Sequence, residues 1–227
     1  AHSTALASLK YPQKSHRKKV ILPKHSTQLA EFFGIMIGDG GINNLWQTTI
    51  SLNSIKDAKY GLYISNLCKT LFDIFPAIRK RKESNTLVIS LASISVVDFL
   101  VSEGLSRGNK LKNGLHIPEW ILNNKLYRKA CVRGLIDTDG CMFIHVHRVK
   151  GKVYRNISLT FTSLSSELIY QVVDILTEFD IIPHINNKGE SIYLYQIDAI
   201  AKYLKIFGTS NERIESLYKK WRDARVV

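Results

Sequence analysis

Apolar and polar residues follow an ordered series of patterns along the first half of this chain. Residues 28–39 predict an apolar helix, and residues 41–53 alternate between apolar and polar side chains, as strands with one buried and one wet face do. An apolar stripe at helical spacing covers residues 55–72. Residues 78–91 then predict a hairpin, and residues 95–102 predict a closing helix.

The same series returns about 100 residues further along the chain. Its members are a helix over 125–139, an alternating pair of strands over 141–162, a helix over 164–179, a hairpin over 184–196 and a helix over 199–207. Each half therefore predicts the order αββαββα. The fold class that follows is α+β, with two pseudo-symmetric halves.

Composition divides the chain further. Residues 1–26 are basic and predict an N-terminal arm, and the polar residues 108–124 predict a linker with a short helix over 118–122 that begins at a proline. The first half then spans 27–107 and the second 125–227.

Small residues recur on the two equivalent helices. Gly34 and Gly38 lie four residues apart in the first helix, and Gly134 and Thr138 repeat that spacing in the second. Residues four apart share one face of a helix, so the small side chains allow a partner backbone to approach closely. We expect the two helices to pack on each other at the centre of the molecule.

Each of these helices ends in the same acidic turn, Asp39-Gly40 and Asp139-Gly140. An aspartate at a helix C-terminus faces the negative end of the helix dipole, and two such aspartates brought together repel each other. Fold stability alone does not reward this arrangement, whereas a divalent cation with hard oxygen ligands would. The repeat therefore predicts one composite Mg²⁺ site, with the two glycines as helix-terminating residues.

Charge and cysteine content restrict the class of protein. The chain has 32 Lys and Arg against 19 Asp and Glu, which gives a net charge of +13. Such an excess favours a polyanionic partner, most often nucleic acid, over a merely soluble basic protein. Three cysteines without a CxxC pair argue against a disulfide framework or a zinc site and favour an intracellular, reducing compartment.

The two repeats, residues 32–40 and 132–140, resemble the nine-residue motif of the LAGLIDADG homing endonucleases. The second copy, Gly134-Leu135-Ile136-Asp137-Thr138-Asp139-Gly140, is the closer match. The first has Phe33, Ile37 and Gly38 where the motif has Ala, Asp and Ala. The resemblance extends over residues 27–222, and a chain with two motifs is similar to the monomeric members.

The resemblance implies two four-stranded antiparallel sheets that form a DNA-binding saddle. It also implies site-specific cleavage of both DNA strands at a long, asymmetric target. Mg²⁺ would be the cofactor, Mn²⁺ would replace it, and Ca²⁺ would bind without supporting cleavage. No membrane or small-molecule cofactor is expected. The implied catalytic residues are Asp39, Asp139, Lys110, Arg213, Asn53 and Thr162, and the implied metal-site residues are Asp39, Asp139, Gly38 and Thr138.

Polar and basic side chains of the strands and turns are then expected to contact DNA, because the wet strand faces would meet the major groove. The expected contact residues are Asn43, Gln47, Thr49, Ser51, Arg79, Arg81, Lys82, His145, His147, Arg148, Lys150, Lys152, Tyr154, Arg155 and Lys188.

Some residues and functions have competing interpretations. His145 and His147 could bind a metal, but two histidines without a third ligand favour DNA or solvent contact. Trp46, Trp120 and Trp221 are expected in the core or an interface, and Asp137 in support of its helix. The rival functions are an RNA-binding intron maturase on the same scaffold and a non-cleaving DNA-binding regulator. Retention of both acids favours the nuclease.

Overall fold

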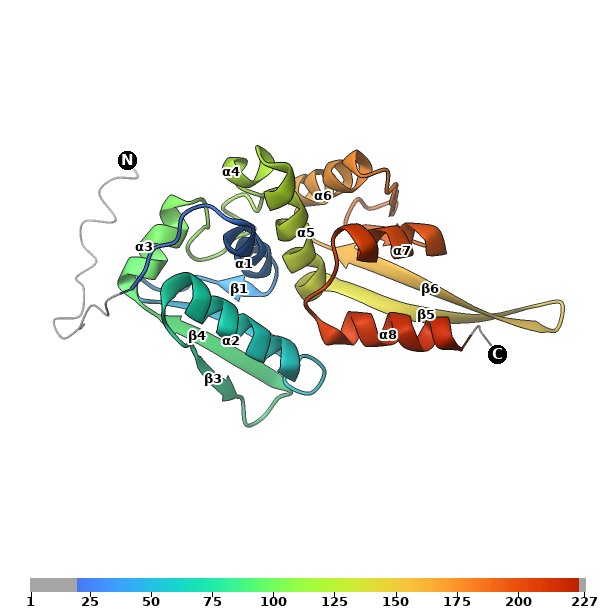
Figure 1. Ribbon diagram of the computed structural model, residues 1–227, viewed down its shortest axis with the longest axis horizontal. Coiled ribbons are helices and arrows are strands. Elements are labelled where there is room, and N and C mark those ends of the chain that lie inside the picture. The colour runs from blue at the N-terminus through green and yellow to red at the C-terminus, as the bar shows by residue number, and fades with distance from the viewer. Residues whose placement is uncertain (1–19, 225–227) are drawn as a thin grey trace.

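The computed structural model describes residues 20–224, apart from the side chain of Val149, and two helices form its centre. Helix α1 (Thr27–Gly38) and helix α5 (Lys125–Asp139) pack against each other, with one sheet on either side of the pair (Figure 1). Ser26 begins α1 by accepting a hydrogen bond from the Leu29 amide, and Asn124 caps α5 in the same way.

The first half contains a four-stranded antiparallel sheet with strand order β1-β2-β4-β3. Its elements are β1 (Gly40–Gly41), β2 (Gln47–Asn53), α2 (Ala58–Phe72), β3 (Ala77–Lys80), β4 (Thr86–Ala92) and α3 (Ile94–Ser102).

The second half repeats that topology with the order β5-β6-β8-β7. After the short connecting helix α4 (Glu119–Leu122), its elements are β5 (Gly140–Val149), β6 (Lys152–Thr162), α6 (Ser166–Glu178), β7 (His184–Ile185), β8 (Ser191–Leu194), α7 (Ile197–Ile206) and α8 (Glu212–Asp223). Hairpin β5–β6 extends away from the helix pair and ends in a turn at Lys150 and Gly151, both with positive φ (Figure 1).

The predicted order αββαββα is confirmed in both halves, and the differences lie at the ends. Strand β1 has only two residues because the chain turns before β2, where Asn44 accepts a hydrogen bond from the Trp46 amide. Pro118 precedes α4 as its cap instead of starting it. Helix α8 was not predicted. The division of the chain at residues 107 and 125 stays a prediction, and the predicted arm lies mostly outside the described residues.

The expectation that the two central helices approach closely is confirmed by their glycines. A Cβ atom on Gly34 would overlap the carbonyl oxygen of Cys131, and one on Gly134 would overlap that of Glu31. These neighbours are backbone atoms of the partner helix, so they cannot move aside. The two helices therefore hold the halves together in a fixed register.

A buried polar cluster forms a second connection between the halves. Glu31 of α1 is 1 % exposed, forms an ion pair with Arg133 of α5, and accepts a hydrogen bond from the Ser210 hydroxyl at 2.7 Å. The Ser210 amide and the Thr209 hydroxyl donate to the carboxylate of Asp137. Asp137 is thus used to hold the loop before α8, as expected of a supporting residue.

Apolar side chains from the helices cover one face of each sheet and leave the other open. Ile50, Leu52 and Ile89 in the first sheet are buried, as are Leu159 and Phe161 in the second. Every helix in residues 20–224 is too short or too polar to cross a lipid bilayer.

Candidate active site and nucleic-acid interface

Asp39 and Asp139 lie at the C-terminal ends of the two packed helices. Asp39 directly follows α1 and Asp139 is the last residue of α5. A Cβ atom built on Gly38 would overlap the hydroxyl of Thr138 and lie 3.3 Å from Oδ2 of Asp139. The absence of a side chain at Gly38 therefore lets the end of α1 approach the carboxylate that ends α5.

The two glycines after the aspartates are required for a different reason than expected. Neither Gly40 nor Gly140 has a positive φ, so they are not helix caps of the left-handed type. A Cβ atom on Gly40 would lie 2.5 Å from the Cα of Met36, and one on Gly140 would overlap the carbonyl oxygen of Ile136. The first residue of each strand thus packs directly on the last helical turn, which holds each aspartate in place.

Burial and mutual repulsion destabilise the charged form of these carboxylates. The pKa of Asp39 is raised to about 7 by burial and by the negative charge of Asp139, against the attraction of Lys110. The pKa of Asp139 is raised to about 6 by burial, again opposed by Lys110. The pair is therefore an electrostatically unfavourable arrangement that a positively charged ligand would relieve.

Lys110 is the cation with the largest effect on the pKa values of this pair. Its Nζ donates hydrogen bonds to the carbonyl oxygens of Ile37 at 2.6 Å, Gly40 at 3.0 Å, and Gly38. Burial lowers the pKa of Lys110, while Asp139 and Asp39 raise it. The lysine thus closes the C-terminus of α1 and adds positive charge beside both carboxylates. Its catalytic role stays a prediction, and its Nζ already uses the Gly38 carbonyl as an acceptor.

Arg213 was the expected counterpart of Lys110; its positive charge lowers the pKa of Asp39 less than that of Lys110 does, and its catalytic role stays a prediction. Arg213 forms an ion pair with Asp57, Nε to Oδ1 at 2.9 Å. The end of α5 is instead closed by Asn211, whose Nδ2 donates to the Asp137 carbonyl at 3.0 Å. Asp137 occupies the position in α5 that Ile37 occupies in α1. Asn211 therefore donates to the carbonyl that corresponds to the one that Lys110 binds.

The donor set fits a divalent cation. Two carboxylates, both partly exposed, offer hard oxygen ligands and leave further coordination positions for water or a substrate oxygen. Among residues 20–224, no three His, Cys, Asp or Glu side chains gather as a complete metal cage, so any ion would depend on such additional ligands. The carboxylate of Asp39 also lines an open cavity of about 370 Å³ together with Lys110, Asn43, Thr49 and Ser51.

The two residues expected to support the site are not equivalent to each other. Gly40 pairs with Ile50 and Gly140 pairs with Phe161, so the register makes Ser51 the equivalent of Thr162. The Ser51 amide donates to the Asp39 carbonyl at 3.1 Å.

Asn53 lies outside the cavity lining, and its Oδ1 accepts hydrogen bonds from the amides of Ile55 and Lys56 in a turn. Thr162 contacts the hydroxyl of Ser191 at 3.0 Å. Their catalytic roles stay predictions.

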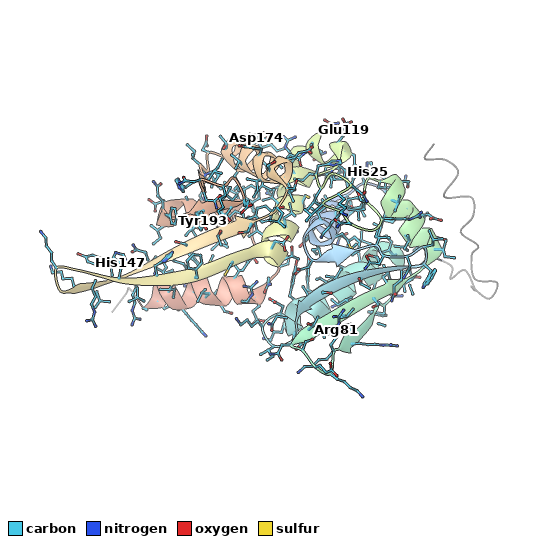
Figure 2. The ribbon with its side chains drawn as sticks, turned by 180° about the vertical axis from the view of Figure 1, so that it is seen from behind. His25, Arg81, Glu119, His147, Asp174 and Tyr193 are labelled. Carbon is cyan, nitrogen blue, oxygen red and sulfur yellow. The ribbon has the colours of Figure 1, made fainter. Side chains whose placement is uncertain are left out.

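The open face of the first sheet carries most of the polar residues expected there. Gln47, Thr49 and Ser51 alternate with buried Ile50 and Leu52 along β2. Across the sheet, the same face continues through Ser90, Val88 and Arg79, and Arg81 follows where the chain leaves β3 (Figure 2). Asn43 is exposed in the loop before β2, and Lys82 lies in the turn before β4.

Pairing along the long hairpin separates the second set of expected contacts into two faces. His145 pairs with Asn156 and His147 with Tyr154, so these side chains share the open face of the sheet with Lys152 (Figure 2). Arg148 and Arg155 alternate with them and therefore lie on the opposite face, where Arg155 lines a groove against α8. Lys150 and Lys188 lie in turns.

Two aromatic residues on this open face were missed from the sequence. These residues are Tyr193 and His184. Tyr193 pairs with Thr160 of β6 and His184 pairs with Tyr193, so both aromatic side chains lie on the same face as Thr160 and His147. Tyr193 also stacks on Tyr195 with ring centroids 5.3 Å apart. The alternation of polar and apolar residues over Ser191–Leu194 could have indicated which side chains lie on the open face. With only four residues, however, β8 is too short for that alternation to be a strong indication.

The tryptophans only partly follow their expectation. Trp221 is buried and donates its Nε1 hydrogen to the Arg155 carbonyl, and Trp120 packs edge-on against Phe33. Trp46, expected in the core or an interface, is 45 % exposed because the loop before β2 holds it at the surface.

His145 contacts Phe143 and His147 stacks on Tyr154, and neither belongs to a three-ligand cluster in the described part of the chain.

The raised pKa values predict that the metal-free protein loses stability as the pH rises. The folded-state pKa values, about 7 for Asp39 and about 6 for Asp139, lie above the unfolded value near 3.8. Folding therefore takes up protons at pH values between the unfolded and the folded pKa. The stabilisation is present below about pH 4 and is lost as the pH rises through 6 and 7. In EDTA, we expect Tm to be lower at pH 8 than at pH 5, and the Asp39→Asn/Asp139→Asn variant to lose less. An equal loss in both proteins would contradict the assignment.

Comparisons with known proteins agree with this architecture. Residues 127–221 match the family model of the LAGLIDADG-like domain. Among solved structures, the homing endonuclease I-LtrWI bound to target DNA aligns with a TM-score of 0.60 and 14 % identity, over 87 % of this chain and 90 % of that one.

Meganuclease I-SmaMI, bound to uncleavable DNA, aligns with a TM-score of 0.56 and 12 % identity over 89 % of each chain. I-AabMI, bound to uncleaved DNA, gives 0.56 and 10 %, over 88 % of this chain and 92 % of that one. No curated protein sequence matches significantly. The chain therefore has the fold of the LAGLIDADG homing endonucleases over most of its length, and residues 127–221 of its second half are similar to the LAGLIDADG-like domain.

Proposed function

We propose that this protein is a site-specific endonuclease that cuts both strands of a long, asymmetric DNA target as a monomer. The observation that carries the proposal is the convergence of Asp39 and Asp139, with Lys110 beside them, between the open faces of two sheets. One chain supplies both acids, so a second copy is not needed to complete the site.

The chemistry proposed is hydrolysis of a phosphodiester on each strand. A water oxygen bonds to phosphorus, one P–O bond to a sugar oxygen breaks, and the leaving oxygen takes up a proton. Asp39 and Asp139 accept hydrogen bonds from water and orient it, and the Lys110 ammonium offsets negative charge that develops on the phosphate. A divalent cation held by the two carboxylates would supply Lewis-acid stabilisation of that phosphate.

Mg²⁺ is the cation proposed, because carboxylates with water positions suit its preference for oxygen ligands. We expect Mn²⁺ to replace it and Ca²⁺ to bind without supporting cleavage. The structural relative I-SmaMI has been crystallised on uncleaved DNA in the presence of calcium ions, which supports testing Ca²⁺ as the non-cleaving ion here.

The two open sheet faces are proposed to read the DNA. Side chains such as Gln47 and His147 alternate along strands, which places donors and acceptors at a spacing suited to base edges in the major groove. Exposed cations of β3 and of the turn after it, including Arg79 and Arg81, would contact phosphates. Structural relatives were crystallised on DNA, which supports duplex DNA as the partner.

A randomised duplex library tests the function directly. The protein is incubated with the library in Mg²⁺ and in Ca²⁺, and cut ends are sequenced. Recurrent cleavage at one non-palindromic site in Mg²⁺ alone is the expected result. Binding of structured intron RNA with no cleavage under any Mg²⁺ condition would instead establish a maturase, and sequence-specific DNA binding without cleavage would establish a regulator.

Duplex binding is expected to weaken steeply with salt, because phosphate contacts release counterions. Raising the salt concentration from about 50 to about 200 mM should raise Kd by at least about 100-fold. Fluorescence anisotropy in Ca²⁺ measures this dependence for the wild type and for Arg81→Gln. The variant should reduce the slope of log K against log salt by about one. A flat salt response in the wild type would contradict binding along the charged faces.

A further inference from the structure

The open faces of the two sheets present different kinds of side chain. The strands of the first sheet, all of which lie in the described part of the chain, contain no aromatic residue. Their open face carries amide, hydroxyl and guanidinium groups, such as those of Gln47, Thr49 and Arg79. The open face of the second sheet is instead lined with rings. We call this set the aromatic face, and its members are Phe143, His145, His147, Tyr154, His184, Tyr193 and Tyr195.

The rings of the aromatic face contact one another but remain accessible. Tyr193 stacks on Tyr195 with ring centroids 5.3 Å apart, and His147 stacks on Tyr154 at 5.5 Å. Tyr195 is nevertheless 51 % exposed and Tyr154 44 %. Ring pairs across strands stabilise a sheet, but burying the rings would stabilise it more. Helices α7 and α8 pack against the other face of the sheet, so the rings stay available to a ligand.

The chemistry of the major groove matches this difference between the sheets. The C5-methyl group of thymine is the one apolar group that the four bases present there, and apolar side chains contact it. Amide and guanidinium groups instead form hydrogen bonds with purine edges. The first sheet therefore carries groups suited to purines, and the second carries groups suited to methylated pyrimidines. Asn156, which pairs with His145, leaves one amide within the aromatic face.

We propose that the aromatic face recognises the C5-methyl groups of pyrimidines. The half of the target bound by the second sheet then depends on these methyl groups, and the half bound by the first sheet does not. The proposal rests on the proposed function and specifies a chemical requirement of its DNA substrate. Thymine and 5-methylcytosine both carry the methyl group at the same place on the major-groove edge. Removing one contacted methyl should raise Kd about fourfold, which corresponds to one CH₂ group no longer buried.

Deoxyuridine in place of thymidine tests the proposal, because it removes the methyl group and keeps every base-pairing group. A duplex is first selected from a randomised library by binding in Ca²⁺, so the test does not require cleavage. The thymines of one half-site at a time are then replaced, and fluorescence anisotropy measures Kd. Replacement in one half-site should raise Kd about fourfold per contacted methyl, and replacement in the other should change Kd less than about twofold.

A second set of duplexes distinguishes the two sources of the methyl group. In this set, 5-methylcytosine replaces each cytosine of one half-site at a time. A deoxyuridine loss without a 5-methylcytosine gain identifies thymine as the base recognised. Tighter binding with 5-methylcytosine, in the half-site that is sensitive to deoxyuridine, shows that methylated cytosine is accepted as well. A gain without a deoxyuridine loss identifies methylated cytosine alone.

Two single substitutions assign the sensitive half-site to the second sheet. Tyr195 follows β8 and His147 is exposed, so Tyr195→Ser and His147→Ser leave the core intact. In each variant, the deoxyuridine effect should become smaller, because a ring that contacts a methyl group is gone. Gln47→Ala is the matched control on the first sheet. It should weaken binding without changing the deoxyuridine effect, and circular dichroism checks that all three variants fold.

The possible failures can be told apart. Equal deoxyuridine effects in both half-sites, unchanged in the variants and without a 5-methylcytosine gain, would overturn the proposal and leave the nuclease in place. The rings would then serve only to stabilise the sheet. Methyl-dependent binding without cleavage in Mg²⁺ would overturn the nuclease function and support methyl recognition. If no duplex sequence were selected, both proposals would fail.

Discussion

Replacing Asp139 by asparagine is expected to lower the rate of DNA cleavage by at least about 1,000-fold. The same substitution is expected to stabilise the metal-free protein. The charge of Asp139 raises the pKa of Asp39, so its removal relieves a repulsion that opposes folding. The loss of activity follows because one of the two proposed cation ligands is gone. Cleavage kinetics in Mg²⁺ and denaturant unfolding in EDTA measure the two effects.

Asp174→Asn is the matched control for this variant. Asp174 is an exposed acid on α6, so the substitution removes the same charge at a surface remote from the helix ends (Figure 2). We expect this variant to cleave DNA at the wild-type rate. Its free energy of unfolding should stay within about 0.5 kcal/mol of that of the wild type. Retained cleavage by Asp139→Asn, or a fold destabilised by it in EDTA, would show that Asp139 has a structural role instead.

Gly134→Ala is expected to destabilise the fold by at least about 2 kcal/mol, although it adds one methyl group. The new Cβ would overlap the carbonyl oxygen of Glu31 in the partner helix, and the helix axes would have to separate. Because Glu31 also belongs to the buried cluster with Arg133 and Ser210, that separation would disturb both connections between the halves. Urea unfolding monitored by circular dichroism measures the loss.

Gly41→Ala provides the control for the glycine substitution. The nearest atom to its Cβ, on Asn43, is 3.8 Å away, which is an ordinary contact. Its stability should therefore stay close to that of the wild type. If Gly134→Ala and Gly41→Ala had the same stability, the close approach of the two helices would not determine how the halves are joined.

The fold was predictable wherever one pattern persists over many residues. The helices around Gly34 and Gly134, and the long strands with His145 and His147, have enough apolar periodicity to be identified. Helix α8 was missed because it follows a second closing helix and its apolar stripe is short, with only Ile214 and Trp221 buried. Tertiary packing against β5, and not local preference, makes it part of the fold.

The candidate site was predictable to the extent that it repeats. Asp39 and Asp139 are found from the repeat, and Lys110 from the resemblance, but Asn211 shares neither charge nor local sequence with Lys110. Its equivalence depends on one hydrogen bond to the Asp137 carbonyl, which three-dimensional contact alone reveals. The face on which Arg155 lies likewise depends on strand pairing that the sequence does not fix residue by residue.

The unequal lengths of the strands have a consequence for the outline of the protein on DNA. Hairpin β5–β6 has strands of 10 and 11 residues, whereas β2 in the first sheet has seven. At about 3.3 Å per residue, the longer hairpin reaches roughly 13 Å further from the centre. With base pairs about 3.4 Å apart, that is about four base pairs. If the protein cuts DNA as proposed, its footprint should therefore be asymmetric and extend further from the cut positions on the side bound by the second half.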